Sequence, residues 1–359
     1  MTKFFNRLAA LVVAVAIFST PAAAQRALQI DNDSVWEHPH SSIAVPTTLA
    51  GLPRARATEF APDFLNVGFS FRMGDDPEEI SLYIYRDTNG GVPVWFEQAR
   101  IGIEMRDIYA NPQLAFGVEQ YGWPGNEVWQ GQRAVYDTPN STYSKSTGVV
   151  LFSVKGWYVK MRATSSVRTA SELRDWIDTA FGEIAPPAAN VSQPPAIPVT
   201  ECAEKLAFKK KAKDAKTDGT AGLMSALLGG MVAEKVQDRQ ESDEPVEAVA
   251  WCRDSSLGRT QVAYRADASI NSYLIALGDS GMGVSVAPDA GAALLSEKSK
   301  KDQSFAITVI TDAQRINFVP QNRLPSLKRV MKIINDNRTI SSVSTWGDDS
   351  SIEINPNAM

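Results

Sequence analysis

The chain has 359 residues with 36 basic and 41 acidic side chains, a formal net charge of −5, two cysteines and two histidines. This acidic balance argues against sequence-independent binding of nucleic acid, which depends on basic surfaces that neutralise phosphates. The length is sufficient for two domains, each with its own hydrophobic core.

Residues 1–24 have the pattern of a secretory signal peptide. Lys3 and Arg7 give a basic start, and the apolar run over 8–18 is too short to span a bilayer. We expect cleavage after Ala24 and a mature protein in the periplasm. No later stretch approaches the ~20 apolar residues that a membrane-spanning helix needs.

We predict an N-terminal domain over residues 25–184. The prolines within 25–62 argue against long regular elements there. The apolar positions between Val94 and Tyr109 favour a helix, although alternation over 101–105 also fits a strand. Strands are predicted by alternation at 66–72, 80–86 and 131–136.

A hairpin and the helix after it are the most strongly specified part of this domain. Two runs rich in β-branched and aromatic residues, 149–154 and 157–163, are separated only by Lys155 and Gly156, which predicts a tight turn with glycine at a positive φ. Alternation predicts a half-buried second strand, with Trp157, Val159 and Met161 on one face and Tyr158, Lys160 and Arg162 on the other. A capping box (Thr169, Glu172) then predicts a helix to Phe181 whose apolar stripe covers the hairpin.

Four short motifs of this region carry a resemblance: Trp36–Pro46, Leu49–Arg54, Leu82–Tyr85 and Gly156–Arg162. Together they resemble a family of exported proteobacterial proteins to which no activity is assigned. The likeness covers roughly residues 35–181. It implies an exported α+β domain and no catalytic or binding residue.

Five prolines within residues 185–198 indicate an extended, semi-stiff spacer, and we place a Pro/Ala-rich linker at 185–199. The C-terminal domain is then residues 200–359. Cys202 and Cys252 are predicted to form a disulfide, because an even cysteine count in an oxidising compartment favours pairing. Such a bond would close a loop of about 50 residues, worth roughly 4 kcal/mol in the chain-entropy model.

The C-terminal domain begins with the least ordinary segment of the chain. Residues 201–215 are predicted to form a basic helix, and 222–232 an apolar helix with a row of small residues. Three interpretations stay open: a cationic and apolar element for a protein or membrane partner, two helices that pack on their own domain, or a disordered segment. The candidate contact residues are Lys209, Lys210, Lys211, Leu223, Leu227, Leu228 and Met231.

Strands are predicted to follow at 246–252, 260–266, 273–277, 283–287, 305–310 and 315–319. A helix opened by Pro325 is predicted to place Leu327, Val330, Met331 and Ile334 on one side. Two weak strands at 340–346 and 351–354 end the chain. The order strand, turn, strand, helix occurs both here and at 149–181, which leaves open whether the two domains arose by duplication.

No set of catalytic residues is evident. Gly278–Gly283 resembles the segment around a nucleophilic serine, but Ser280 has no histidine downstream to accept its proton, so we interpret the segment as a glycine turn. His38 and His40 beside Glu37 have ligand chemistry, yet a proline between the histidines disfavours a shared metal ion, and a surface loop is the better interpretation. Dinucleotide and phosphate-loop glycine spacings do not occur.

The sequence therefore predicts an α+β protein of two domains, each an antiparallel sheet covered by helices, without a bound cofactor or metal. Our leading hypothesis is an exported, non-enzymatic binding or envelope-associated protein that presents surfaces to a protein or membrane partner. The alternative is a periplasmic hydrolase with an unidentified carboxylate or serine site.

Overall fold

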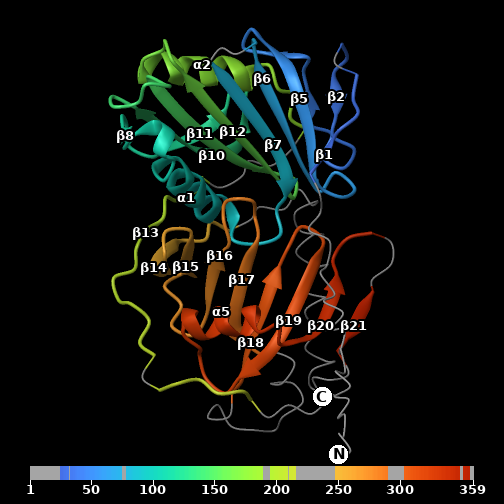
Figure 1. The fold of residues 1–359 in the computed structure, drawn as a ribbon, viewed down its shortest axis with the longest axis vertical. Coiled ribbons are helices and arrows are strands. Elements are labelled where there is room, and N and C mark those ends of the chain that lie inside the picture. The colour runs from blue at the N-terminus through green and yellow to red at the C-terminus, as the bar shows by residue number, and fades with distance from the viewer. Residues whose placement is uncertain are drawn as a thin grey trace, which may run out of the picture.

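The computed structural model describes residues 25–31, 33–74, 78–188, 195–208, 210–215, 247–289, 303–347 and 351–355. The predicted signal peptide lies outside this range. In the part that is described, strands predominate and form two large sheets accompanied by three helices (Figure 1). The prediction of two sheet-based bodies is confirmed, and both bodies are mostly β.

The N-terminal body is built on a sheet of ten strands. They are β1 (Arg26–Ala27), β4 (Thr48–Leu49), β5 (Leu52–Ala61), β6 (Asn66–Arg72), β7 (Glu79–Arg86), β8 (Gln113–Leu114), β9 (Glu119–Trp123), β10 (Asn126–Asp137), β11 (Ser146–Val154) and β12 (Trp157–Ser165). Their order is β1-β5-β6-β7-β12-β11-β10-β8, with β4 on β5 and β9 on β10. A separate small sheet pairs β2 (Trp36–Glu37) with β3 (Ala44–Val45).

The predicted hairpin is confirmed as β11 and β12, in antiparallel register from Val154 opposite Trp157 to Ser146 opposite Ser165. Lys155 shares the positive φ of Gly156, at 45° and 79°. Positive φ at both turn residues matches the right-handed twist of the flanking strands.

The prolines of 25–62 do not prevent a long strand, and this prediction was wrong. β5 has ten residues, and its proline, Pro53, is the second of them. A proline near the start of a strand costs little, because its missing N–H lies outside the main ladder.

Two helices pack on opposite faces of the ten-stranded sheet. α2 (Ala170–Gly182) has the predicted capping box and buries the predicted stripe, including Leu173 and Phe181. α1 (Gly91–Glu104) is a helix, as favoured, but it ends before Tyr109, which lies in a short 3-10 turn (Asp107–Tyr109). The strand alternative for 101–105 is excluded because residues 101–104 are helical.

The C-terminal body is a nine-stranded sheet in sequence order. Its strands are β13 (Thr200–Glu201), β14 (Trp251–Leu257), β15 (Gln261–Ala266), β16 (Tyr273–Ala276), β17 (Gly283–Pro288), β18 (Phe305–Ile310), β19 (Gln314–Gln321), β20 (Thr339–Ser344) and β21 (Ile352–Ile354). All pairs are antiparallel except β13 with β14. α5 (Leu327–Asn335) packs on this sheet through the buried residues Leu327, Val330 and Ile333. The predicted Met331 and Ile334 are partly buried against the same core, and Ile333 is the residue that the prediction missed.

The predicted basic helix over 201–215 does not form. The described residues are irregular apart from Glu201 in β13 and an isolated bridge from Asp214 to Gln321. The segment is attached to the C-terminal body at both ends, by the confirmed Cys202–Cys252 disulfide at one end and by the Asp214 carboxylate, bound by Arg329 and Arg338, at the other. Between these ends the Leu206 backbone N–H donates to the Asp254 carboxylate (2.9 Å). Tertiary contacts therefore override its helical propensity.

The two bodies share a core around α1, which lies between the sheets (Figure 1). Trp95 of α1 clusters with Tyr158 of the N-terminal sheet and with Tyr264 and Leu274 of the C-terminal sheet. The described ends of the proline-rich segment also pack inward, since the Gln132 amide donates a hydrogen bond to the Ala196 carbonyl (3.1 Å). Whether the two bodies fold independently stays a prediction.

Candidate functional site

The face of the N-terminal sheet that α1 covers carries polar and charged residues from every central strand. In one row, β-register places Thr58, Gly68, Tyr83 and Lys160 side by side on β5, β6, β7 and β12. The next row contains Arg56, Ser70, Ser81 and Arg162. We call this surface the polar face.

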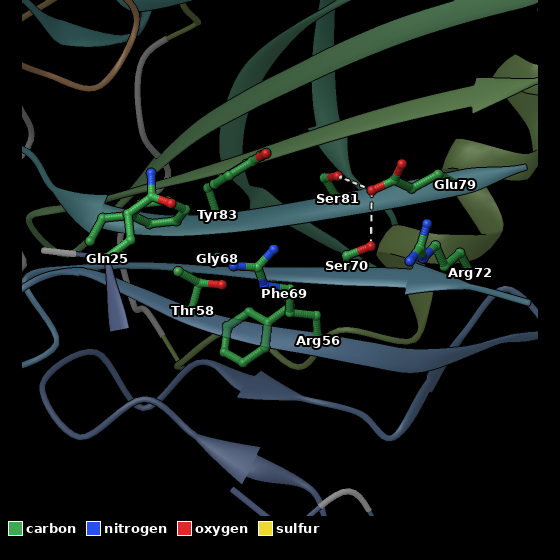
Figure 2. Close-up of a pocket in the computed structure, with 11 residues that line it drawn as sticks. Gln25, Arg56, Thr58, Gly68, Phe69, Ser70, Arg72, Glu79, Ser81 and Tyr83 are labelled. Atoms are coloured by element: carbon green, nitrogen blue, oxygen red, sulfur yellow. Dashed lines mark hydrogen bonds between the residues drawn. The ribbon is translucent and has the colours of Figure 1, made fainter. Parts of the chain in front are cut away.

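α1 and the C-terminal body cover the β12 side of the polar face, together with Tyr85 at the end of β7. There Tyr158 is fully buried and Lys160 is 5% exposed, so the prediction of a half-buried strand was wrong for β12. On the side of β5, β6 and β7 the polar face is hollowed into a groove of about 290 Å³ (Figure 2). Its lining residues are Gln25, Arg56, Thr58, Phe60, Gly68, Phe69, Ser70, Arg72, Glu79, Ser81 and Tyr83.

The floor of the groove is set by Gly68. A Cβ atom at this position would lie 2.8 Å from the Phe60 ring and 2.9 Å from the Tyr83 ring, closer than real side chains approach. The two rings therefore lean over the bare glycine backbone, with their centroids 6.2 Å apart. This arrangement gives a polar groove an aromatic floor.

Charged groups surround this floor. Glu79 accepts hydrogen bonds at Oε1 from the hydroxyls of Ser70 (2.9 Å) and Ser81 (3.0 Å), as the dashed lines in Figure 2 show. Arg72 is the cross-strand neighbour of Glu79, yet the two form no ion pair. Among the described residues neither Arg56 nor Arg72 has an acidic partner, and both side chains are exposed.

Beside the groove, the C-terminal body inserts a carboxylate. Asp279 Oδ2 accepts from Lys160 Nζ (3.0 Å) and Arg162 Nη2 (2.5 Å). Burial would raise the pKa of Asp279, but the two cations outweigh it and hold the pKa well below its usual value. Burial lowers the pKa of Lys160, and Asp279 opposes that shift. Lys160 Nζ also lies 5.2 Å from the centroid of the Tyr83 ring, which links this ion cluster to the groove wall.

Asp279 belongs to the glycine-rich segment 278–283, which joins β16 to β17 as the predicted turn, with Leu277 N donating to Met282 O. The turn therefore supplies the acid that docks on the N-terminal body. Ser280 follows it, and both histidines of the chain lie elsewhere, on the loop around β2.

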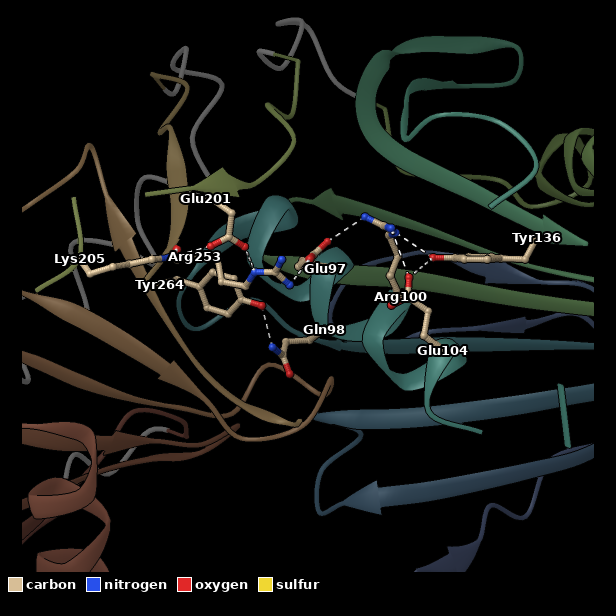
Figure 3. A network of polar contacts seen from close by, with 9 residues as sticks. All are labelled: Glu97, Gln98, Arg100, Glu104, Tyr136, Glu201, Lys205, Arg253 and Tyr264. Atoms are coloured by element: carbon tan, nitrogen blue, oxygen red, sulfur yellow. Dashed lines mark hydrogen bonds and ion pairs between the residues drawn. The ribbon is translucent and has the colours of Figure 1, made fainter. Parts of the chain in front are cut away.

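α1 carries a second polar contact with the C-terminal body (Figure 3). Glu97 accepts from Arg253 (3.4 Å), which also pairs with Glu201, and the Gln98 amide hydrogen bonds with the Tyr264 hydroxyl (2.7 Å). These contacts fix the position of α1, and with it one wall of the polar face.

A third junction lies beyond the end of β7. The Arg86 guanidinium donates to the Asp312 carbonyl (2.9 Å) and lies over the Trp346 ring. The Trp346 indole in turn donates to the Asp63 carboxylate (2.5 Å) and contacts the His40 ring. Burial raises the pKa of Asp312 to about 7, and its Oδ1 is buried without a hydrogen-bond partner.

Asp87, the neighbour of Arg86, is a second buried carboxylate. Burial raises the pKa of Asp87 to about 6. Asp87 and Asp312 are each only 9% exposed, and neither lines the groove. Asp312 lies at the junction between the bodies, whereas Asp87 accepts a hydrogen bond from the Ser153 hydroxyl of the N-terminal sheet (2.7 Å).

The histidines lie on the loop around β2, and the interpretation as a surface loop was wrong for His38, although His40 is exposed. His38 is fully buried, its Nδ1 accepts from the Ser41 backbone N–H (3.1 Å), and its Nε2 contacts the Phe64 carbonyl (3.0 Å). Burial lowers the pKa of His38 to about 4. Both ring nitrogens of His38 therefore take part in hydrogen bonds within the loop. The described residues contain no group of three or more side chains arranged to hold a metal ion.

The predicted partner-contact residues are mostly untested. Lys210 and Lys211 are exposed on an irregular segment. Lys209, Leu223, Leu227, Leu228 and Met231 lie outside the described residues. None of the described helices is long and apolar enough to cross a membrane.

Sequence reasoning missed Arg56, Arg72 and Asp279. One available signal was the turn motif Gly278–Gly283, which contains a single charged residue, Asp279. Another was Gly68 between two strand-forming residues, because a glycine inside a strand often marks a place where another group approaches the backbone closely. Neither signal shows that the two segments meet. No family model matches the chain, and no curated protein or solved structure is significantly similar to it.

Proposed function

We propose that this protein is an exported, non-enzymatic binding protein whose ligand occupies the groove on β5, β6 and β7. The observation that carries the proposal is the groove itself: a hollow with an aromatic floor and polar walls on a sheet whose other face is closed. Concave sites that combine apolar surface with a few polar groups are the usual form of small-molecule sites. The Cys202–Cys252 disulfide supports an oxidising compartment, for which we propose the periplasm.

A hydrolase would need an acid or base within reach of the bound ligand. The carboxylates with raised pKa values, Asp87 and Asp312, are buried and do not line the groove. Among the described residues that line the groove, the acid is Glu79, which accepts hydrogen bonds from two serine hydroxyls. The geometry therefore favours binding over hydrolysis.

Nuclear magnetic resonance of the labelled full-length mature chain tests the proposal. We expect a panel of sugars, amino acids, dicarboxylates and phosphate esters to include a compound whose chemical-shift changes cluster on β5, β6 and β7. Gly68→Ala should weaken its binding at least tenfold, because a methyl group there displaces the two rings of the floor.

The matched control is Gly117→Ala between β8 and β9, where an added methyl group meets no atom within 4 Å and the backbone has no positive φ. It should leave binding unchanged. Shift changes that map outside the groove, with equal affinity in the Gly68→Ala variant, would refute the proposal.

A further inference from the structure

We propose that the groove recognises a tetrahedral oxyanion ester, a phosphate or a sulfate, through Arg56 and Arg72, and that the organic part of the same ligand packs on Phe60 and Tyr83. This inference rests on the proposed function and names the class of ligand. Four observations on the described residues carry it.

The first is the local charge. The whole chain is acidic, with a formal net charge of −5. On the polar face the balance is reversed, because Arg56, Arg72, Lys160 and Arg162 stand against Glu79 and Asp279. Asp279 is already shared by Lys160 and Arg162, which leaves Arg56 and Arg72 as the cations of the groove. A concave basic site on an acidic protein attracts anions in preference to cations.

The second is the contrast between two arginines of β5. Arg54 is 4% exposed and donates to the backbone carbonyls of Asp31 (2.6 Å) and Ser34 (2.9 Å), so it fastens the N-terminal loop. Arg56 faces the groove and has no such partner among the described residues. A structural role accounts for Arg54, whereas the guanidinium of Arg56 is available to a ligand.

The third is the spacing of the two groove arginines. Arg56 lies opposite Ser70, and Arg72 is two residues further along β6 on the same face. Diagonal neighbours of this kind lie roughly 7–8 Å apart, with their Cβ atoms somewhat closer, which is within reach for two long side chains that converge on one group. Figure 2 shows both side chains over the same face of the sheet. One guanidinium satisfies the two oxygens of a carboxylate, whereas two guanidiniums suit a group with three terminal oxygens.

The fourth is the floor. The rings of Phe60 and Tyr83 lie beside the arginines and present apolar surface to whatever the oxyanion is attached to. A free inorganic ion would leave that surface unused. An ester with an apolar or ring-shaped body contacts both parts of the groove.

Isothermal titration calorimetry of the full mature chain with four probes tests this inference: phenyl phosphate, phenyl sulfate, inorganic phosphate and phenol. We expect at least one phenyl ester to bind, inorganic phosphate to bind at least tenfold more weakly than that ester, and phenol to give no measurable heat. The tighter of the two esters identifies whether the natural group is a phosphate or a sulfate.

Arg56→Ala and Arg72→Ala should each weaken binding of that ester at least tenfold. Arg56→Lys should recover only part of the loss, because an ammonium keeps the charge but not the planar fork. The control is Arg259→Ala, an exposed arginine in the β14–β15 turn, which should not change binding. Circular dichroism melts of the variants verify that they are folded.

The results that would overturn the oxyanion assignment differ from the results that would overturn the proposed function. Equal affinity for phenol and phenyl phosphate, or unchanged affinity in both arginine variants, would overturn the oxyanion assignment. So would the absence of binding by all four probes when resonance mapping finds another ligand in the groove; that result leaves the proposed function standing. Ester binding that Gly68→Ala does not weaken would count against both.

Discussion

The two faces of the ten-stranded sheet are built from alternate residues of the same strands, but they are closed in different ways. The α2 face is apolar, and α2 follows directly after β12, so neighbouring parts of the chain close it. The polar face is covered partly by α1 and partly by a turn more than a hundred residues further along the chain, and it stays open over β5, β6 and β7. An apolar face can therefore be buried by any neighbouring apolar element. A charged face is buried without a large desolvation cost only where the covering segment supplies opposite charges or hydrogen-bond partners.

The largest loss of stability is expected for a substitution on the α2 face. Phe152 is fully buried and its ring lies 4.9 Å from Trp123 and 5.2 Å from Phe181. Phe152→Ala should lower the free energy of unfolding by about 4 kcal/mol, because it leaves a cavity in a closed core. Urea denaturation followed by circular dichroism measures this change. A loss below about 1 kcal/mol would mean that this face repacks freely, contrary to the comparison.

On the covered part of the polar face, Asp279→Ala should cost about 3 kcal/mol, because it leaves Lys160 and Arg162 buried without their shared anion. Lys160→Met should be less harmful in the Asp279→Ala background than in the native chain. A double-mutant cycle measures this coupling. Strictly additive effects would show that the ion cluster does not hold the two bodies together.

The junction at Arg86 should make stability depend on pH. The pKa of Asp312 is raised by burial from 3.8 to about 7, so the folded protein binds this proton more tightly than the unfolded chain. Its stabilising contribution is complete below pH 4 and is lost as the pH rises to 7. Between pH 5 and 7 the free energy of unfolding should fall by about 2 kcal/mol.

Asp312→Asn is the control for this dependence, since an amide cannot ionise. The pH profile of its unfolding free energy should be flatter than that of the native chain over the same range. An unchanged slope would assign the dependence to another group, with Asp87 as the next to test because its pKa is also raised, to about 6.

The smallest change in stability is expected for a substitution on the open part of the polar face. Arg56→Ala should change the free energy of unfolding by less than about 0.5 kcal/mol, because the side chain is exposed and has no acidic partner among the described residues. Thermal melts measure it alongside Arg54→Ala, which removes a buried guanidinium bound to backbone carbonyls and should be clearly destabilising. A comparable loss of stability in the Arg56→Ala and Arg54→Ala variants would show that Arg56 has a structural role.

Local patterns were enough for much of the fold. Alternation identified β6, β7, β11 and β12, and the capping box at Thr169 gave the start of α2. The paired cysteines were also predicted correctly. Local patterns failed where the outcome depended on distant contacts: residues 201–215 were predicted helical but the described residues among them form no helix, and β12 was predicted half-buried but has both faces covered.

The sequence by itself determined which residues lie on each face of the strands that alternation predicted, such as β6, β7 and β12, because the two-residue period of a strand is a local property. It also determined the hairpin turn and the helix cap, which depend on a few neighbouring residues. Only the tertiary structure decided that Asp279 lies between Lys160 and Arg162, that Gly68 lies beneath two aromatic rings, and that Arg56 and Arg72 share a groove. These contacts join residues far apart in the chain, and their register is set by sheet order and by the docking of one body on the other, which no local period encodes.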